Sequence, residues 1–257
     1  MVTQITRPSH NGHKAKQATN LNNGTYTISQ RLCASEHRTL FLGVQQGVER
    51  PVLIERIDAI AAPVAEMALA HRHVVQELCH SNIAQFVDAF AEQGAFYTIQ
   101  CAGSSGTPLS AQASLTPAQV AIYGIHMCNA LSYLEHHHME LVAADIAPSS
   151  IFITSSGRAR LTALAALLGV HAEAHHSPFT ARQATEPAAT VFSLGATLHH
   201  SLTNWSGNYR AGAPAITASR TDVAPELNAV IMRALAPNLT ERYTHIADLR
   251  LALLRFQ

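Results

Sequence analysis

Residues 141–168 read L-V-A-A-D-I-A-P-S-S-I-F-I-T-S-S-G-R-A-R-L-T-A-L-A-A-L-L, and the rest of the chain is organised around this stretch. The run I-F-I, which is β-branched and aromatic, predicts a short strand. Gly157 then predicts a turn, and the run that follows it predicts a second strand. The residues before the first strand, which include Asp145 and Pro148, predict a loop. The stretch therefore predicts a loop that leads into a β-hairpin.

This stretch resembles the catalytic and metal-binding hairpin of bacterial Ser/Thr protein kinases. In that family the loop reads roughly H-R-D-x-K-P-x-N-I-L-I, and the second strand ends in D-F-G. Asp145 and Pro148 keep the residues of the family. The family's His, Arg, Lys, Asn and D-F-G positions instead carry Ala143, Ala144, Ala147, Ser150 and the run Ala163, Leu164, Ala165. The resemblance implies a kinase-shaped protein that does not transfer phosphate.

The order of segments along the chain agrees with this resemblance. Residues 1–23 are polar and are expected to form a disordered N-terminal arm, followed by a kinase-like domain over residues 24–257. Strand-like runs with one helical stretch between about residues 24 and 100 predict an N-lobe with a five-stranded antiparallel sheet and one helix. From about residue 103 to 257 the helical period predicts a mainly α-helical C-lobe. The expected fold class is α+β, a two-lobed protein kinase-like fold.

Three further motifs support the same fold. H-S-N-I at residues 80–83 resembles the family's H-P-N-I, and T-V-F-S-L-G-A-T-L-H-H-S-L-T-N at residues 190–204 resembles its buried C-lobe helix. Thr116 and Gln119 form a capping box around Pro117, which predicts the start of a long helix. The apolar residues that follow predict one buried face of this helix: Val120, Tyr123, Met127, Leu131 and Leu134. Arg242 occupies the position of the family's C-lobe Arg. The resemblance covers the chain from about residue 26 to 256.

Phosphoryl transfer needs a phosphate cradle, a Lys on the third strand, metal-holding acidic groups and a base. The glycine positions of the cradle carry Cys33, Ser35 and Arg38, which predicts an ordinary hairpin turn. The strand Lys falls on Glu55, which would repel the phosphates of a nucleotide. The helix Glu that pairs with that Lys falls on His71. A contact between Glu55 and His71 would reverse the polarity of the pair; the alternative is that both side chains face water.

Metal binding would need the D-F-G Asp and the loop Asn, because hard cations prefer oxygen ligands. Ala163 supplies no ligand and Ser150 only a hydroxyl, so neither a metal nor another cofactor is expected. Asp145 stands where the base would be, but without a positioned phosphate a base has nothing to accelerate. The favoured role of Asp145 is to hydrogen-bond the loop amides.

The nucleotide pocket is predicted to be filled by side chains. The Ala that leaves room above the adenine ring in the family's V-A-I-K is Leu53 here, and Phe152 stands where the family usually has Leu. Gln100, at the gatekeeper position, would add a polar side chain to the rear wall. Contact between the two enlarged side chains would replace the apolar contact of adenine. The nucleotide pocket is therefore predicted to be collapsed or free of water.

The supports of the catalytic loop are also changed. The family's A-P-E best matches residues 177–179, which leaves Arg242 without its usual Glu. Because an unpaired buried charge is costly, Glu186 or Glu173 is expected to replace that Glu, or Arg242 to lie nearer water. Thr190 stands where the family has the Asp that braces the loop. Selection for activity is therefore expected to be absent.

Charge, cysteine and histidine content narrow the class of protein. Only 13% of the residues are charged and the formal net charge is zero, so neither nucleic acid nor an acidic membrane is expected as a partner. A surface poor in charge tolerates a lasting interface, although an Ala-rich and Gln-rich host proteome explains the composition equally well.

The four cysteines, without a C-x-x-C, predict reduced thiols in a cytoplasmic protein. No apolar run reaches the roughly 18 residues of a membrane span, and the polar N-terminus is not expected to be a signal peptide. The sixteen histidines match no zinc spacing, so solvent-facing or capping roles are favoured over a metal site.

Two classes of function remain. The leading hypothesis is a catalytically inactive pseudokinase, a scaffold-like module that binds proteins as an allosteric partner, as a subunit of a larger assembly or as a homo-oligomer. The alternative is a weakly active or ATP-binding Ser/Thr kinase with a rewired active site around Asp145. Occupation of the pocket by Leu53 and Phe152 would favour the first.

Overall fold

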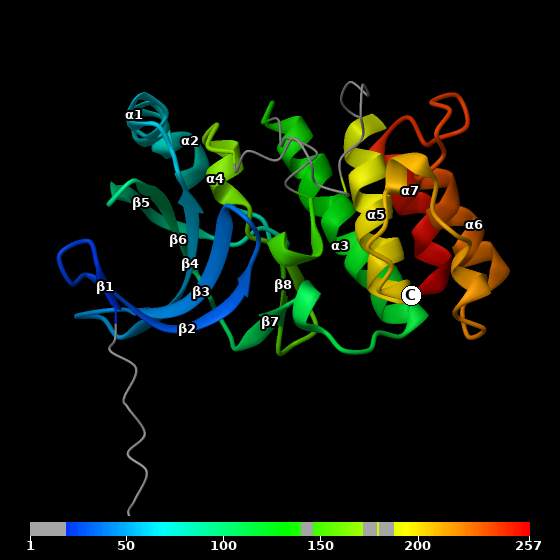
Figure 1. Cartoon of the computed structure of the whole chain (residues 1–257), viewed down its shortest axis with the longest axis horizontal. Helices are drawn as coiled ribbons and strands as arrows, with labels where there is room; N and C mark the ends of the chain where they lie inside the picture. Colours follow the sequence, from blue (N-terminus) through cyan, green and yellow to red (C-terminus); the bar gives the residue numbers. More distant parts are fainter. Residues whose placement is uncertain (1–18, 140–145, 172–178, 180–187) are drawn as a thin grey trace, which may run out of the picture.

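The computed structural model describes residues 19–139, 146–171, 179 and 188–257. These residues form two lobes that lie side by side, with the N-terminal strands in one lobe and most of the helices in the other (Figure 1). A small sheet and a short helix, α4, lie between the two (Figure 1). Within the described part of the chain, no helix is long and apolar enough to cross a membrane.

The N-lobe is a six-stranded antiparallel sheet in the order β1-β2-β3-β4-β6-β5. Its strands are β1 (Thr19–Leu21), β2 (Tyr26–Ala34), β3 (Arg38–Gln45), β4 (Arg50–Asp58), β5 (Phe86–Glu92) and β6 (Ala95–Cys101). Successive side chains of a strand point to opposite faces of the sheet. Val52 and Ile54 of β4 accordingly pack in one apolar cluster, whereas Leu53 belongs to another that includes Phe152 of the opposite lobe.

Two details of the N-lobe differ from the expectation. The sheet has six strands rather than five, because β1 forms inside the segment expected to be a polar arm and pairs Leu21 with Tyr26. The turn between them, N-N-G-T, places Asn22, Asn23 and Gly24 at positive φ, a conformation that Asn and Gly tolerate. Turn chemistry and the burial of Leu21 thus outweigh the polar composition.

The helical stretch of the N-lobe is also divided, into α1 (Ala62–Ala70) and α2 (Arg72–Gln76) rather than one helix. His71 separates them, and its Nδ1 lies 2.8 Å from the carbonyl oxygen of Met67. The backbone N–H of His71 donates to the same carbonyl at 3.2 Å, so at the end of α1 this oxygen is bonded by both the main chain and the side chain of His71.

The C-lobe is built around α3 (Pro117–His136), with α5 (Ala188–Thr203) and α7 (Ile246–Leu253) beside it, and α6 (Pro225–Ala234) packs against α5 and α7. The capping box of Thr116 and Gln119 opens α3 as predicted. The small sheet consists of β7 (Gly106–Pro108), β8 (Ile151–Thr154) and β9 (Ala159–Leu161), and α4 (Leu164–Leu167) follows it.

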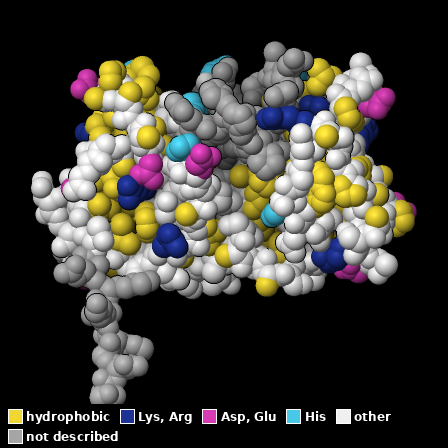
Figure 2. All heavy atoms as spheres, viewed as in Figure 1, with side chains coloured by type: hydrophobic (Ala, Val, Ile, Leu, Met, Phe, Trp, Pro, Cys, Tyr) yellow, Lys and Arg dark blue, Asp and Glu magenta, His cyan; other side chains and the backbone are white. Residues whose placement is uncertain are grey.

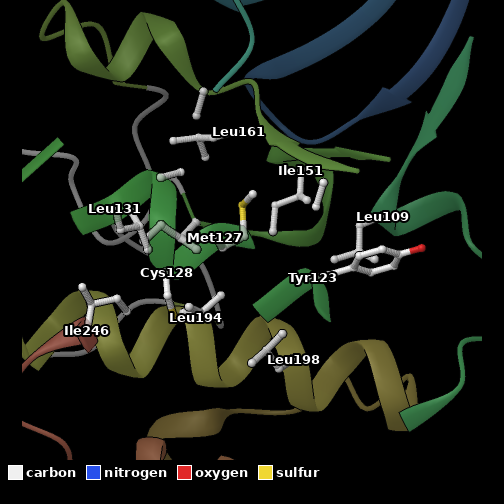
Figure 3. Packing of buried hydrophobic residues seen from close by; sticks show 14 of the residues in the cluster. Leu109, Tyr123, Met127, Cys128, Leu131, Ile151, Leu161, Leu194, Leu198 and Ile246 are labelled. Carbon is white, nitrogen blue, oxygen red and sulfur yellow. The ribbon is translucent and has the colours of Figure 1, made fainter. Parts of the chain in front are cut away.

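The largest core cluster surrounds α3. Figure 3 shows Met127 and Cys128 of this helix between Ile151 and Leu161 of the β8–β9 hairpin on one side and Leu194 of α5 on the other. The predicted apolar face of α3 is buried throughout: Val120, Tyr123, Met127, Leu131 and Leu134. The hairpin is thereby held between the core of the C-lobe and the N-lobe sheet.

Candidate functional site between the lobes

The candidate site lies where β3, β4 and β6 of the N-lobe face the β8–β9 hairpin and the start of α4. Strand register brings Leu40, Glu55 and Thr98 side by side on three neighbouring strands. Glu55 and Leu53 share a face of β4, since they are two residues apart. One half of the site is consequently polar around Glu55, and the other half is apolar around Leu53.

Glu55 is a buried carboxylate with a complete set of donors. Its side chain is 1% exposed, and its Oε1 accepts from Nε of Arg38 at 2.7 Å. Its Oε2 accepts from the hydroxyl of Thr98 at 2.8 Å and from the backbone N–H of Ala165 at 3.1 Å. Nε2 of Gln100 lies 3.4 Å from the same oxygen. Glu55 and Arg38 therefore form a buried ion pair, and both oxygens of the Glu55 carboxylate accept hydrogen bonds.

Arg38 carries the other charge of this pair, and its exposed fraction is 7%. One terminal nitrogen donates to the carbonyl of Ser149 at 2.9 Å. The other donates to Oγ1 of Thr162 at 3.2 Å. Nε2 of Gln100 also donates to the carbonyl of Thr162, at 2.8 Å. We call this set the Glu55 network: Arg38, Glu55, Thr98, Gln100 and Thr162.

The apolar half of the site is filled by side chains. Leu53 and Phe152, each 1% exposed, pack in one cluster with Leu40 and Ala102. Gly106 of β7 makes room for the ring, because a Cβ at this position would lie 2.7 Å from Cε1 of Phe152. The two side chains that were expected to fill the pocket, Leu53 and Phe152, are thus in one buried cluster.

The residues at the cradle positions form a closed turn between β2 and β3. The N–H of Ser35 donates to the carbonyl of Arg38 at 2.7 Å. Sγ of Cys33 lies 3.7 Å from the carbonyl oxygen of Ser149. Burial raises the pKa of the Cys33 thiol, against the opposite effect of the nearby Arg38. Side chains thus occupy the turn that bare backbone would form in a phosphate cradle.

The residues at the two positions where a kinase would bind metal, Ser150 and Ala163, have structural roles in their own segments. Ser150 is buried, and its hydroxyl accepts from the N–H of Ala147 at 3.0 Å and donates to the carbonyl of the same residue at 2.8 Å. Ala163 is buried and precedes the first turn of α4. Among the described residues, no group of three or more His, Cys, Asp or Glu side chains is placed to hold a metal. Asp145 and Ala143 lie outside the described residues.

The suggested contact between Glu55 and His71 is wrong. His71 is exposed and its ring contacts the Met67 carbonyl, whereas Glu55 is paired with Arg38. The position of Arg38 explains the difference. Arg38 stands two residues before Leu40, the cross-strand partner of Glu55, and such diagonal neighbours lie within reach of long side chains.

Within the described residues, the hydrogen-bond partners of the Arg242 side chain are backbone carbonyls. Nε donates to the carbonyl of Ala236 at 3.0 Å, and one terminal nitrogen donates to the carbonyl of Ala188 at 3.1 Å. The guanidinium carbon lies 4.9 Å from the centre of the Phe192 ring. Burial lowers the pKa of Arg242. Glu173, Glu186 and Ser177 lie outside the described residues.

Sequence reasoning missed three members of the Glu55 network: Arg38 as an ion-pair partner, and Thr98 and Thr162 as hydrogen-bonding side chains. A signal for Arg38 was present, since the turn Q-G-V-E at residues 46–49 fixes the register of β3 against β4. No comparable signal placed Thr162, whose position depends on the docking of the β8–β9 hairpin against the N-lobe.

The chain has a two-lobed protein kinase-like fold of the α+β class, as the motifs predicted. It superposes on a mutant of the PknI kinase domain from Mycobacterium tuberculosis with a TM-score of 0.69 and 20% identity, over 90% of this chain and 95% of that chain. It superposes on Rad53 in complex with AMP-PNP with a TM-score of 0.70 and 14% identity, over 89% of this chain and 64% of that chain. No family model matches the chain, and no curated protein matches it in sequence.

Proposed function

We propose that this chain is a catalytically inactive pseudokinase that serves as a protein-binding module in the cytoplasm. The observation that carries the proposal is the Glu55 network. Where an active kinase has a Lys that contacts nucleotide phosphates, this chain has a buried carboxylate already paired with Arg38.

Charge supports the absence of nucleotide binding. Both lysines of the chain, Lys14 and Lys16, precede residue 19, so no Lys lies within the described lobes. Arg38 is the cation closest to Glu55, and its Nε is committed to that carboxylate. A triphosphate would have to take Arg38 from Glu55, and leaving one partner of a buried pair uncompensated costs about 3–5 kcal/mol.

Packing supports the same conclusion. An adenine ring would have to separate Leu53 from Phe152 and expose their cluster. Fully burying one large apolar side chain contributes about 1.5–3 kcal/mol, so opening the cluster costs a similar amount before any contact to the ligand forms.

The protein-binding role is supported by the surface. Charged side chains are sparse over the face shown in Figure 2, in agreement with the charged fraction of 13%. Large exposed apolar side chains also occur on both lobes: Val48, Met67, Val74, Leu239 and Leu251. A surface of this kind is compatible with a stable complex or a homo-oligomer, and a formal net charge of zero gives nucleic acid no overall electrostatic attraction.

Thermal unfolding with ATP tests the proposal. We expect no rise in Tm at about 5 mM ATP, with or without Mg²⁺ or Mn²⁺, because a ligand that binds only the folded state must raise Tm. The matched control is the double variant Leu53→Ala, Phe152→Leu, which opens the apolar half and should make adenosine binding detectable as a rise in Tm.

Two results would contradict the proposal. A rise in Tm of the wild-type protein with ATP would identify a nucleotide sensor. Transfer of labelled phosphate to the protein or to a generic substrate, lost in Asp145→Asn, would identify a weakly active kinase. The binding role is tested separately by the molar mass of the protein isolated from its own cells, where a monomer without partners would contradict it.

A further inference from the structure

We propose that Arg38 and Glu55 form a clamp that fixes the two lobes relative to each other without a bound ligand. This inference goes beyond the proposed function, because it concerns the geometry of the lobes rather than catalysis or binding. It is carried by the distribution of the hydrogen bonds of Arg38 between the lobes.

The Glu55 network draws its members from both sides of the interface. Arg38 of β3, Glu55 of β4 and Gln100 of β6 belong to the N-lobe sheet. Ser149 and Thr162 flank the β8–β9 hairpin of the other side. Nε of Arg38 bonds the N-lobe carboxylate, while its two terminal nitrogens bond groups of Ser149 and Thr162. A single guanidinium therefore joins the two sides.

Separation of the lobes would leave polar groups without partners on both sides at once. The carbonyl of Thr162 would lose Gln100, and the N–H of Ala165 would lose Glu55. Buried donors and acceptors are costly to leave unpaired. The free-energy cost of separating the lobes thus includes these unpaired groups in addition to the broken ion pair.

A second set of bonds between the lobes reports on such opening. The N–H of Ala84 donates to the carbonyl of Leu161 at 2.9 Å, and the N–H of Leu161 donates to the carbonyl of Asn82 at 2.8 Å. These amides do not contact Arg38, so their protection from hydrogen exchange reflects the contact between the lobes rather than the substituted side chain.

Hydrogen exchange of Arg38→Met tests the clamp. We expect the amides of Ala84, Leu161 and Ala165 to lose protection by about tenfold or more, because local opening between the lobes becomes easier. The amides of the β3–β4 ladder and of α3 should keep theirs, since their bonds stay within one lobe.

Arg242→Met is the matched control. Arg242 is as deeply buried as Arg38, at 6% against 7% exposure, but its hydrogen bonds to described residues stay inside the C-lobe. This variant should leave the exchange of Ala84 and Leu161 unchanged. A uniform loss of protection in Arg38→Met, or unchanged protection at the three reporter amides, would overturn the clamp.

Chemical rescue keeps the test decisive should Arg38→Met fold poorly. Arg38→Ala leaves a cavity beside Glu55 that matches a guanidinium, so about 10 mM methylguanidinium should raise the Tm of this variant and not that of Arg242→Ala. No rise, or an equal rise in both variants, would count against the clamp. Both measurements are made without nucleotide, so their failure would leave the proposed absence of ATP binding untouched, and a positive ATP titration would leave the clamp untouched.

Discussion

At the scale of single residues, Glu55 stands where the resemblance of V-L-I-E to the kinase motif V-A-I-K would place a Lys. The sequence predicted that Glu55 replaces this Lys and that Leu53, Gln100 and Phe152 line the pocket. The partner of Glu55 was not predicted, because Arg38 was considered only as a residue that replaces glycine. The sequence names the charge at each position, but the pairing depends on strand register and on the docking of the two lobes.

Restoring the kinase residue at this position should harm the protein. Glu55→Lys would place two cations in contact within the Glu55 network, and a broken buried pair costs about 3–5 kcal/mol of unfolding free energy. Glu55→Gln is the milder control, because it keeps the shape and part of the hydrogen bonding, and should cost about 1–3 kcal/mol. Urea unfolding measures both, and a Glu55→Lys protein as stable as the wild type would contradict the assigned pairing.

At the scale of elements, the long helix α3 was the most predictable part of the chain. Its capping box and its apolar face are local patterns, and both were read correctly from the sequence. The strand β1 and the break at His71 were missed. β1 forms because a turn brings T-N-L against β2, and the break at His71 coincides with a side-chain bond to the Met67 carbonyl. Neither event leaves a hydrophobic period in the sequence.

The strand β7 depends on the small size of Gly106. In Gly106→Ala the new Cβ would meet the carbonyl oxygen of Ile153 as well as the Phe152 ring. We expect the unfolding free energy to fall by about 1–3 kcal/mol, as in other cases of overpacking. Ser105→Ala, at the exposed neighbouring position, is the control and should be close to neutral. Equal stabilities of the two variants in urea would contradict this prediction, because they would show that β7 moves to accommodate the added methyl group.

At the scale of the whole molecule, stability should depend on pH through buried histidines. His199 is 0% exposed, and its Nε2 donates to the carbonyl of Pro214 at 2.9 Å. Burial lowers the pKa of His199, and also that of His80 and His126. A histidine whose folded pKa is depressed stays neutral in the native state while the unfolded chain takes up a proton. Stability is therefore lost as the pH falls below the unfolded pKa of about 6.5.

We expect the unfolding free energy of the wild type to fall between pH 7.5 and 5.5, with His199 contributing at most about 1.4 kcal/mol per pH unit. His199→Gln should unfold more easily at pH 7.5 but show a shallower pH dependence. The exposed His136 provides the control, since His136→Gln should keep the wild-type slope. Urea unfolding at several pH values measures the slopes, and an unchanged slope in His199→Gln would contradict the role of burial.

The two-lobed fold was predictable at this scale because several ordered motifs of the chain follow one family pattern. The hydrogen bonds between the lobes were less predictable, because Ser149, Thr162 and Arg38 are distant in sequence and no local pattern joins them. With the proposed clamp and without nucleotide binding, the two lobes would keep the same relative orientation in rich medium and in starvation. An assembly that contained this protein would then respond to the amount of the protein and not to the concentration of ATP.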